Sequence, residues 1–193
     1  MPWEKQFDVD EALTGAMQVF WAQGYSATST QDLLDRMGIN RGSLYDTFGS
    51  KRELFLSALD HYEKTYQRQK IAQAGAGRAP RETIHALFSG LAAEALTGEG
   101  RSGCLLVNTA LELAPHDAEI AEIVRAAMHG IEEFFFTTVE QGQSSGDIPD
   151  HVNAADAARA LLALLIGLRV LARSLPDKAV LDSIVVQASA LIE

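Results

Sequence analysis

The chain has 193 residues, 47 % of them hydrophobic, which is enough to bury a sizeable core, and its net charge is -10. This negative charge argues against indiscriminate binding to nucleic acid, because the phosphate backbone would repel it. Any DNA binding must therefore use a local basic surface. A single cysteine excludes an intrachain disulfide, which fits a cytoplasmic protein. The most apolar stretch, residues 160–168, is well short of the roughly 20 residues of a membrane-spanning helix, so we expect no membrane partner.

The spacing of apolar residues predicts helices along nearly the whole chain, and no segment has the alternation of a strand. Glycine and proline mark where several helices stop, as at Gly24, Gly38 and Pro115, with loops expected at 97–103 and 142–149. We therefore expect an all-α fold of about nine helices. In chain order these cover residues 9–23, 30–37, 41–48, 51–73, 81–96, 104–113, 120–141, 153–174 and 177–192.

Two of the predicted helices, 30–37 and 41–48, are short and are joined by the tight turn Gly38–Asn40. This arrangement is typical of a helix-turn-helix motif. In that motif the second helix enters the major groove and its first residues meet the base edges, where an arginine can pair with guanine or with phosphate. The residues expected on its outer side are Arg41, Gly42, Ser43, Tyr45, Asp46 and Thr47.

The segment from Phe20 to Leu54 resembles the DNA-binding signature of the TetR family of transcriptional regulators. The resemblance implies a three-helix helix-turn-helix head over residues 1–50 and a helical ligand-binding and dimerisation domain over residues 51–193. The shared features, in order, are an aromatic residue followed by Gly-Tyr (Phe20, Gly24, Tyr25), a Thr-x-Thr-like pair (Thr28, Thr30), a small turn (Met37–Asn40), Gly-Ser-Leu-Tyr-x-x-Phe (Gly42–Phe48) and Ser-Lys-x-x-Leu (Ser50–Leu54).

The same resemblance assigns roles to single residues of the head. Tyr45 and Lys51 are expected to contact phosphate, and Thr28 and Thr30 to flank the groove and cap the helix that follows. Apart from the resemblance, the distribution of charge places Arg52 with Arg41 and Lys51 at the expected DNA-facing surface. The remaining expected DNA contacts, at or near the base edges, are Arg41, Gly42, Ser43 and Thr47. This chain has Asp46-Thr47 where relatives often have histidine or a second aromatic residue, so their base preferences are not transferred.

The helices at 153–174 and 177–192 occupy the place where TetR-type proteins dimerise through a four-helix bundle. The first of them is apolar on more than one face, which favours a second packing surface, although the central helix of a monomer is an open alternative. A two-fold homodimer would present two heads roughly 34–36 Å apart, which matches a near-palindromic double-stranded DNA operator.

Cys104 is expected at the start of a helix, with Arg101 nearby, a setting that favours thiolate. The residues 103–108, followed by Glu112, resemble a TetR branch whose repressors respond to electrophiles of the N-ethylmaleimide type and to acrylate. Cys104 is thus an electrophile-sensing thiol, part of a pocket for a reversible small-molecule effector with Asn108 and Phe134, or a buried core thiol.

Arg169 interrupts the apolar helix at 153–174. Buried charges are usually paired, so one interpretation is an ion pair with Glu112, Glu132 or Glu133. The other interpretation makes the guanidinium the counter-ion of an anionic effector.

Together these patterns predict a ligand- or electrophile-responsive repressor, without a cofactor, a metal or enzymatic activity. The histidines are scattered and none has the spacing of a metal site. Three alternatives stay open: a DNA-binding activator or ligand-independent regulator, an enzyme with Cys104 as nucleophile, and a helical module that only dimerises. The enzyme would need a base near the thiol, and no neighbouring histidine is visible in the sequence.

Overall fold

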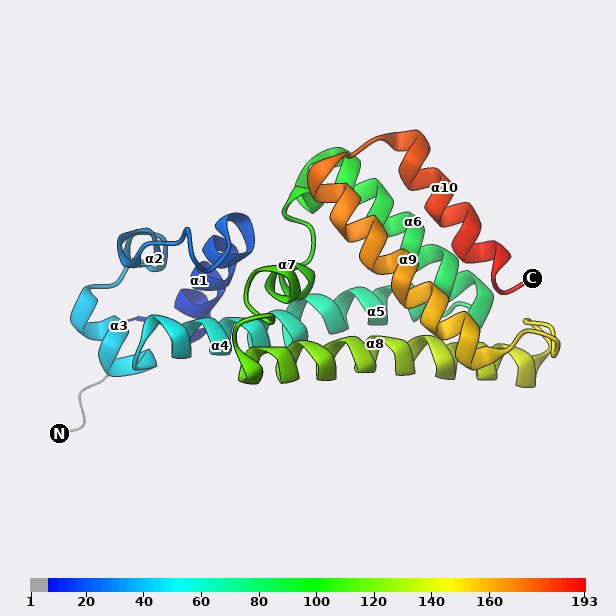
Figure 1. Ribbon diagram of the computed structural model, residues 1–193, viewed down its shortest axis with the longest axis horizontal. Helices are drawn as coiled ribbons and strands as arrows, with labels where there is room; N and C mark the ends of the chain where they lie inside the picture. Colours follow the sequence, from blue (N-terminus) through cyan, green and yellow to red (C-terminus); the bar gives the residue numbers. More distant parts are fainter. Residues whose placement is uncertain (1–6) are drawn as a thin grey trace.

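The computed structural model describes residues 7–193, and all the regular secondary structure in this range is helical. A compact N-terminal group of short helices lies at one end of the molecule, and the remaining helices extend away from it (Figure 1). This group, the head, contains α1 (Val9–Gln23), α2 (Thr30–Met37) and α3 (Arg41–Phe48).

A long rod leads from the head into the body. It consists of α4 (Lys51–Tyr62), the π-helical turn η1 (Glu63–Gln67) and α5 (Arg68–Gly75). The rod runs along the long axis of the molecule, as α8 (Ala118–Ser145) does (Figure 1). The sequence predicts one helix over 51–73, which agrees with the rod except for its π-helical turn. Such turns occur mostly as single interruptions of α-helices and often at functional sites.

The body is completed by helices that pack obliquely across these long elements (Figure 1). If the rod is counted as one helix, residues 7–193 contain nine α-helical elements besides one short 3-10 turn, which confirms the prediction. Besides the rod and α8, the elements of the body are α6 (Pro80–Thr97), the 3-10 turn η2 (Glu99–Ser102), α7 (Leu105–Glu112), α9 (Ala154–Ser174) and α10 (Lys178–Ala190).

The loop predicted at 142–149 begins four residues later than expected, because α8 continues through Ser145 and has Gly146 as its C-cap. At Gly142, a Cβ atom would come within 2.5 Å of the Ile148 side chain. Glycine is therefore placed here for close packing of the returning chain and not to stop the helix.

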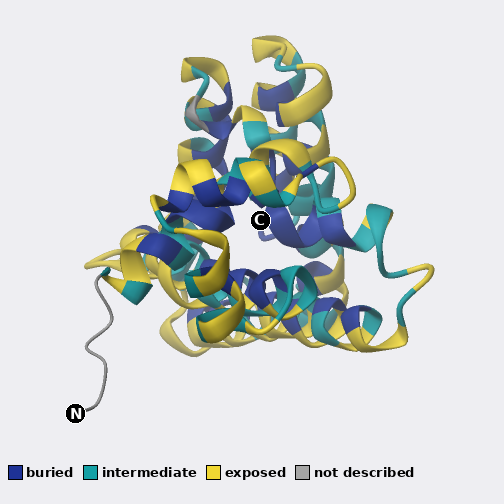
Figure 2. Ribbon diagram, turned by 90° about the vertical axis from the view of Figure 1, so that its left-hand side faces the viewer, coloured by how far each residue is buried: buried dark blue, intermediate teal, exposed yellow. Residues whose placement is uncertain are grey.

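The hydrophobic side chains form two clusters. The first joins the three head helices to α4, α7 and the N-terminal half of α8, and the second joins α6, α9, α10 and the C-terminal half of α8. Seen from the head end, buried residues line the inward sides of the helices and exposed residues the outward sides (Figure 2). The first cluster crosses residue 50, and the domain boundary expected there stays a prediction. None of the described helices is long and apolar enough to cross a membrane.

Candidate DNA-binding surface and effector cavity

Short-range hydrogen bonds shape the helix-turn-helix. The Ser29 hydroxyl accepts a hydrogen bond from the Asp32 amide at 3.1 Å, and the Asp32 carboxylate accepts one from the Ser29 amide at 2.8 Å. This reciprocal pair is a capping box that starts α2, so of the three hydroxyl residues at 28–30 that could cap this helix, Ser29 is the cap and Thr28 and Thr30 are not. Gly38 ends α2 with φ 67°, a conformation that suits glycine. Asn40 then caps α3 by accepting from the Ser43 amide at 2.9 Å.

The recognition helix α3 separates an inner side from an outer one. Leu44 is fully buried and Phe48 packs against the first core. Tyr45 is 41 % exposed, a large value for an aromatic residue in a small domain. On the outer side, Arg41, Gly42, Tyr45 and Asp46 are exposed, while Ser43 and Thr47 are half-buried. The residues expected to reach DNA on α3 therefore share an accessible surface at the free end of the molecule (Figure 1).

Two residues expected to contact the DNA backbone are engaged within the head. Thr28 is buried, and its hydroxyl donates to the Gly24 carbonyl at 2.6 Å. The Lys51 ammonium donates to the Tyr25 carbonyl at 2.8 Å and lies 4.5 Å from the centre of the Tyr25 ring. Burial lowers the pKa of Lys51. In this conformation both side chains hold the α1–α2 connection, whereas Thr30 is half-buried at the first position of α2.

Arg52 does not join the DNA-facing cations, contrary to expectation. Its guanidinium lies 2.8 Å from the Asp117 carboxylate and 2.7 Å from the Glu119 carboxylate. Hydrogen bonds from these two acids hold the pKa of Arg52 above its ordinary value. Asp117 is the N-cap of α8 and Glu119 lies in its first turn, so Arg52 joins the start of the rod to the body.

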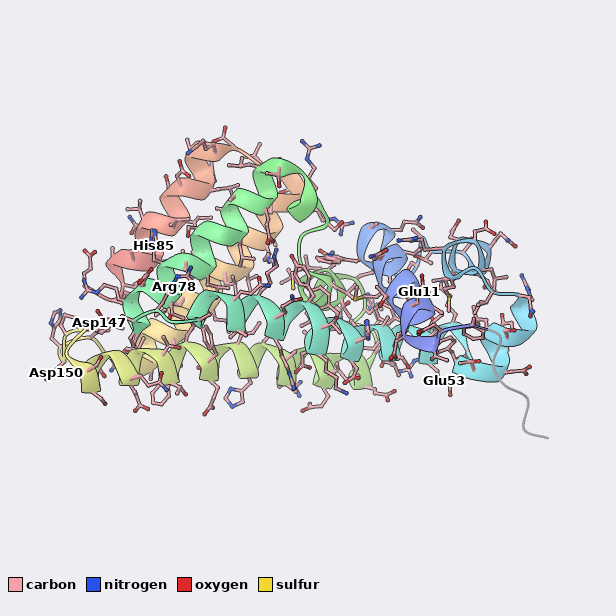
Figure 3. All side chains as sticks on the ribbon, turned by 180° about the vertical axis from the view of Figure 1, so that it is seen from behind. Glu11, Glu53, Arg78, His85, Asp147 and Asp150 are labelled. Carbon is pink, nitrogen blue, oxygen red and sulfur yellow. The ribbon has the colours of Figure 1, made fainter. Side chains whose placement is uncertain are left out.

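Figure 3 shows where charged side chains lie on the two parts of the molecule. Glu11 and Glu53 lie at the head end, whereas Asp147 and Asp150 lie at the opposite end of the body.

Arg41 is exposed, and no ion pair among residues 7–193 engages it. Arg41 is therefore the cation of α3 that can approach a phosphate or a base edge.

Glu112, at the end of α7, binds the connection between α1 and α2. Its carboxylate accepts hydrogen bonds from the Tyr25 amide at 3.0 Å and the Ser26 amide at 2.7 Å. Burial alone would raise the pKa of Glu112, but the hydrogen bonds from Ser26 and Tyr25 hold it below its ordinary value. The contact joins residues 87 and 86 positions apart, and no local pattern in the sequence signals it.

Arg173, on α9, makes a second contact with the head. Its guanidinium donates to the Trp21 and Ala22 carbonyls, both at 3.4 Å, and to the Ser102 carbonyl at 3.3 Å. Cations near a helix C-terminus interact favourably with the unpaired carbonyls of its last turn. Thus α7 and α9 together hold the end of α1 and the loop that leads to the helix-turn-helix.

A cavity of about 40 Å³ lies in the body beside the π-helical turn. Its wall is mostly apolar and comes from the rod, α6, α7, α8 and α9. The polar groups in this wall belong to Tyr62, Gln67, Lys70, Cys104 and Arg169. Two of the four residues predicted to sense an effector, Cys104 and Arg169, thus meet at one cavity.

The other two predicted sensing residues lie elsewhere. The Asn108 amide donates to the Ser102 carbonyl at 3.0 Å, and this side chain borders a surface groove with Glu112 and Arg173. Phe134 packs against the second core, with its ring centre 5.3 Å from that of Phe135. Neither residue belongs to the wall of the cavity.

Arg169 is buried, with 7 % of its surface exposed, and the expected ion pair is absent from the described residues. Glu112 is held by the head amides, Glu132 lies 3.4 Å from Arg159, and Glu133 is exposed. The guanidinium carbon lies 5.8 Å from the centre of the Tyr66 ring, and its Nη1 atom is buried without a hydrogen-bond partner.

Cys104 is buried and stands immediately before α7 as its N-terminal flanking residue. Among residues 7–193, no cluster of histidine, cysteine and acidic side chains has the geometry to hold a metal ion. His85 lies on α6 (Figure 3). Its Nδ1 atom is 3.1 Å from the Ser189 hydroxyl.

Comparison with known proteins agrees with this architecture. The family model described as "Bacterial regulatory proteins, tetR family" matches residues 12–58, and the one described as "Tetracyclin repressor-like, C-terminal domain" matches residues 80–187. The HTH-type transcriptional repressor ComR of Escherichia coli (strain K12) is 31 % identical over 88 % of this chain and 81 % of its own. The HTH-type transcriptional regulator YezE of Bacillus subtilis (strain 168) is 34 % identical over 75 % and 74 %.

Among solved structures, a cysteine mutant of the TetR family transcriptional regulator CifR superimposes with a TM-score of 0.86 at 30 % identity. The match covers 97 % of this chain and 98 % of that one, which was solved in complex with 26 bp double-strand operator DNA. The chain therefore belongs to the TetR family and is a DNA-binding transcriptional regulator of that type. Its relatives are regulators, a class of protein that is not enzymatic.

Proposed function

We propose that this regulator is a repressor that binds a near-palindromic operator as a homodimer in the cytoplasm and is released when an effector occupies the cavity of its body. The observation that carries the proposal is the accessible outer side of α3, which presents Arg41 and Tyr45 at the free end of a TetR-type head. The repressor ComR and the operator complex of CifR support the same reading by similarity.

The proposed DNA contacts fall into two groups. Arg41, Gly42, Ser43 and Thr47 would face the base edges at the start and along the outer side of α3. Tyr45 and Thr30 would contact phosphates, with Lys51 joining them only if its ammonium shares or leaves the Tyr25 carbonyl. Thr28 would act by holding the Gly24 carbonyl and so the entry to α2.

Dimerisation is proposed through α9 and α10. Exposed residues recur at intervals of four, three and four along α10, which places them on one side of the helix: Ala179, Ser183, Val186 and Ala190. Val186 is 61 % exposed and Val170, on α9, is 38 % exposed, so an apolar strip with small neighbours faces outward. A two-fold axis beside these helices would form a four-helix bundle and pair the heads for adjacent half-sites.

A second candidate for the effector is an electrophile that modifies Cys104, because this thiol lies in the cavity wall. A bulky adduct would not fit about 40 Å³ without moving α7, which carries Glu112 and its head contact. Alkylation with iodoacetamide should then abolish operator binding by the natural chain and leave a Cys104→Ser variant unaffected. Equal binding by alkylated and untreated protein would exclude the thiol switch.

The proposed DNA recognition is tested by fluorescence anisotropy with DNA from upstream of the protein's own gene. Arg41→Ala should weaken binding by about 1–3 kcal/mol, since that is the range for one good base contact. Arg125→Ala is a matched control, because Arg125 is exposed on α8 and pairs only with Glu122 among the described residues. Equal affinities for the natural chain and Arg41→Ala on every neighbouring intergenic DNA would contradict the assignment of α3.

A further inference from the structure

We infer that the effector is a small organic anion whose carboxylate pairs with Arg169 while its apolar part fills the rest of the cavity. The inference rests on the proposed function, because it names the chemical class of the ligand at that site. It is carried by a charged side chain that is more than nine-tenths buried, lines the cavity and has an unpartnered hydrogen-bond donor.

Arg169 keeps its charge at every pH at which proteins fold. A buried charge without a counter-ion is strongly unfavourable, and a buried polar atom without a partner calls for an explanation. The ring and the hydroxyl of Tyr66 offer the guanidinium a partial compensation, and its Nη1 atom still has no acceptor. A ligand carboxylate would supply both the missing acceptor and the missing negative charge.

The other charged groups beside the cavity are already balanced. The Lys70 ammonium pairs with the Glu94 carboxylate, which also accepts a hydrogen bond from the Tyr66 hydroxyl at 3.1 Å. This group is neutral as a whole, so the net charge facing the cavity is that of Arg169. An anion is therefore favoured over a cation or a neutral molecule of the same shape.

A second unpartnered atom lies in the same wall. The Oε1 atom of Gln67, in the π-helical turn, is buried without a hydrogen-bond partner. Gln67 can donate through its amide nitrogen or accept through this oxygen. Because a carboxylate only accepts hydrogen bonds, Gln67 would turn its amide nitrogen to the ligand and bind the polar end beside Arg169, while residues such as Leu87 and Ile131 would enclose the apolar end.

The cavity volume limits the ligand and indicates how binding would act. About 40 Å³ exceeds the roughly 10–15 Å³ that a cavity needs to hold one water molecule, so the ligand-free cavity is small but not closed to solvent-sized groups. A carboxylate with even a short apolar chain needs more room, so it would bind an expanded body better than the compact one. Differential binding of this kind shifts the population toward the expanded geometry.

Trp21 provides a direct readout, because its ring centre lies 4.9 Å from that of Tyr62 and 4.6 Å from that of Tyr66. Trp3→Phe leaves Trp21 as the only tryptophan of the chain. In this background we would titrate the full-length protein with butanoate, hexanoate and benzoate, and with 1-butanol, 1-hexanol and benzyl alcohol as neutral counterparts. We expect saturable changes in fluorescence with the carboxylates, at affinities roughly 10- to 100-fold above those of the alcohols.

The decisive variant is Arg169→Met, which replaces the guanidinium with an apolar chain of similar length. It should remove the preference for carboxylates, whereas Arg159→Met, an exposed change on the same helix, should leave it intact. Carboxylates that bind no better than the alcohols, or that bind Arg169→Met as tightly as the natural chain, would overturn the inference. Circular dichroism establishes that each variant is folded.

Failure of the inference is distinguishable from failure of the proposed function. Operator binding is measured separately by anisotropy, so a protein that binds operator and ignores carboxylates remains a regulator with another effector. A protein that shows the carboxylate preference through Trp21 but binds no operator retains the anion site and loses the proposed role as a repressor.

Discussion

Arg169 and Arg173 lie one turn apart on α9 and serve two different sites. Arg169 lines the cavity, whereas Arg173 donates to the carbonyls of Trp21 and Ala22 at the end of α1. Both belong to one rigid helix, so a displacement of α9 by a ligand at Arg169 would also move the contact that Arg173 makes with the head. The same pair of residues thus connects the proposed effector site to the helix-turn-helix.

Arg173→Ala should weaken this connection without removing either site. We expect the variant to bind operator, and to bind hexanoate as the natural chain does, but to be released from operator less effectively by saturating hexanoate. Anisotropy with and without the carboxylate measures the ratio of the two operator affinities, which typically lies at 5- to 150-fold in coupled systems. Lys178→Ala, at an exposed pair with Asp182, is the control. Release as complete as that of the natural chain would show that the coupling bypasses Arg173.

Arg169→Met should stabilise the ligand-free protein. Replacing buried charged groups by apolar residues of similar volume is often neutral or favourable by about 1–4 kcal/mol, and Arg169 lacks even the ion pair that would offset its desolvation. In a domain of this size, each kcal/mol corresponds to about 2–4 °C in the melting temperature. Differential scanning calorimetry of ligand-free Arg169→Met and Arg159→Met measures the difference. A lower melting temperature for Arg169→Met alone would mean that the guanidinium is compensated within the ligand-free fold.

Glu112 should make stability depend on pH in the acid range. Its pKa is lowered in the folded state, so the stability it contributes is fully present above its unfolded pKa of about 4.3 and is lost as pH falls through the lower folded value. Urea unfolding between about pH 6 and pH 3 should show the natural chain losing more stability than Glu112→Gln. The two chains should therefore differ most at the upper end of this range. Parallel curves would show that the carboxylate charge has no part in holding the α1–α2 connection.

Gly142→Ala and Gly130→Ala should change stability in opposite directions, although both lie within α8. A Cβ at Gly142 meets the side chain of Ile148 at 2.5 Å, whereas nothing lies within 4 Å of a Cβ at Gly130. Overpacking costs about 1–3 kcal/mol, and alanine in an open helical site gains about 0.5–1 kcal/mol over glycine. Thermal unfolding of the two variants against the natural chain gives both values. A stable Gly142→Ala would show that Ile148 can move aside and that the turn after α8 is loosely packed.

The sequence by itself determined the helices and the helix-turn-helix, because these depend on residues close together in the chain. The capping box of Ser29 and Asp32, the turn at Gly38 and the cap at Asn40 each act within three or four positions. The apolar spacing that follows 3.6 residues per turn then identifies the inward side, as Leu44 shows. The family signature lies in the same stretch, so it can be identified from the sequence without knowledge of the tertiary packing.

Only the tertiary structure decided which charged and polar side chains meet, since their partners lie far along the chain. Arg52 pairs with the acids at the start of α8 instead of joining the DNA-facing cations. Glu112 binds the α1–α2 connection instead of pairing with Arg169. Helical spacing fixes which side chains share a face but not the rotation of one helix against another. That rotation, set by the close packing of two hydrophobic clusters, leaves Arg169 buried at the cavity without a carboxylate partner among the described residues.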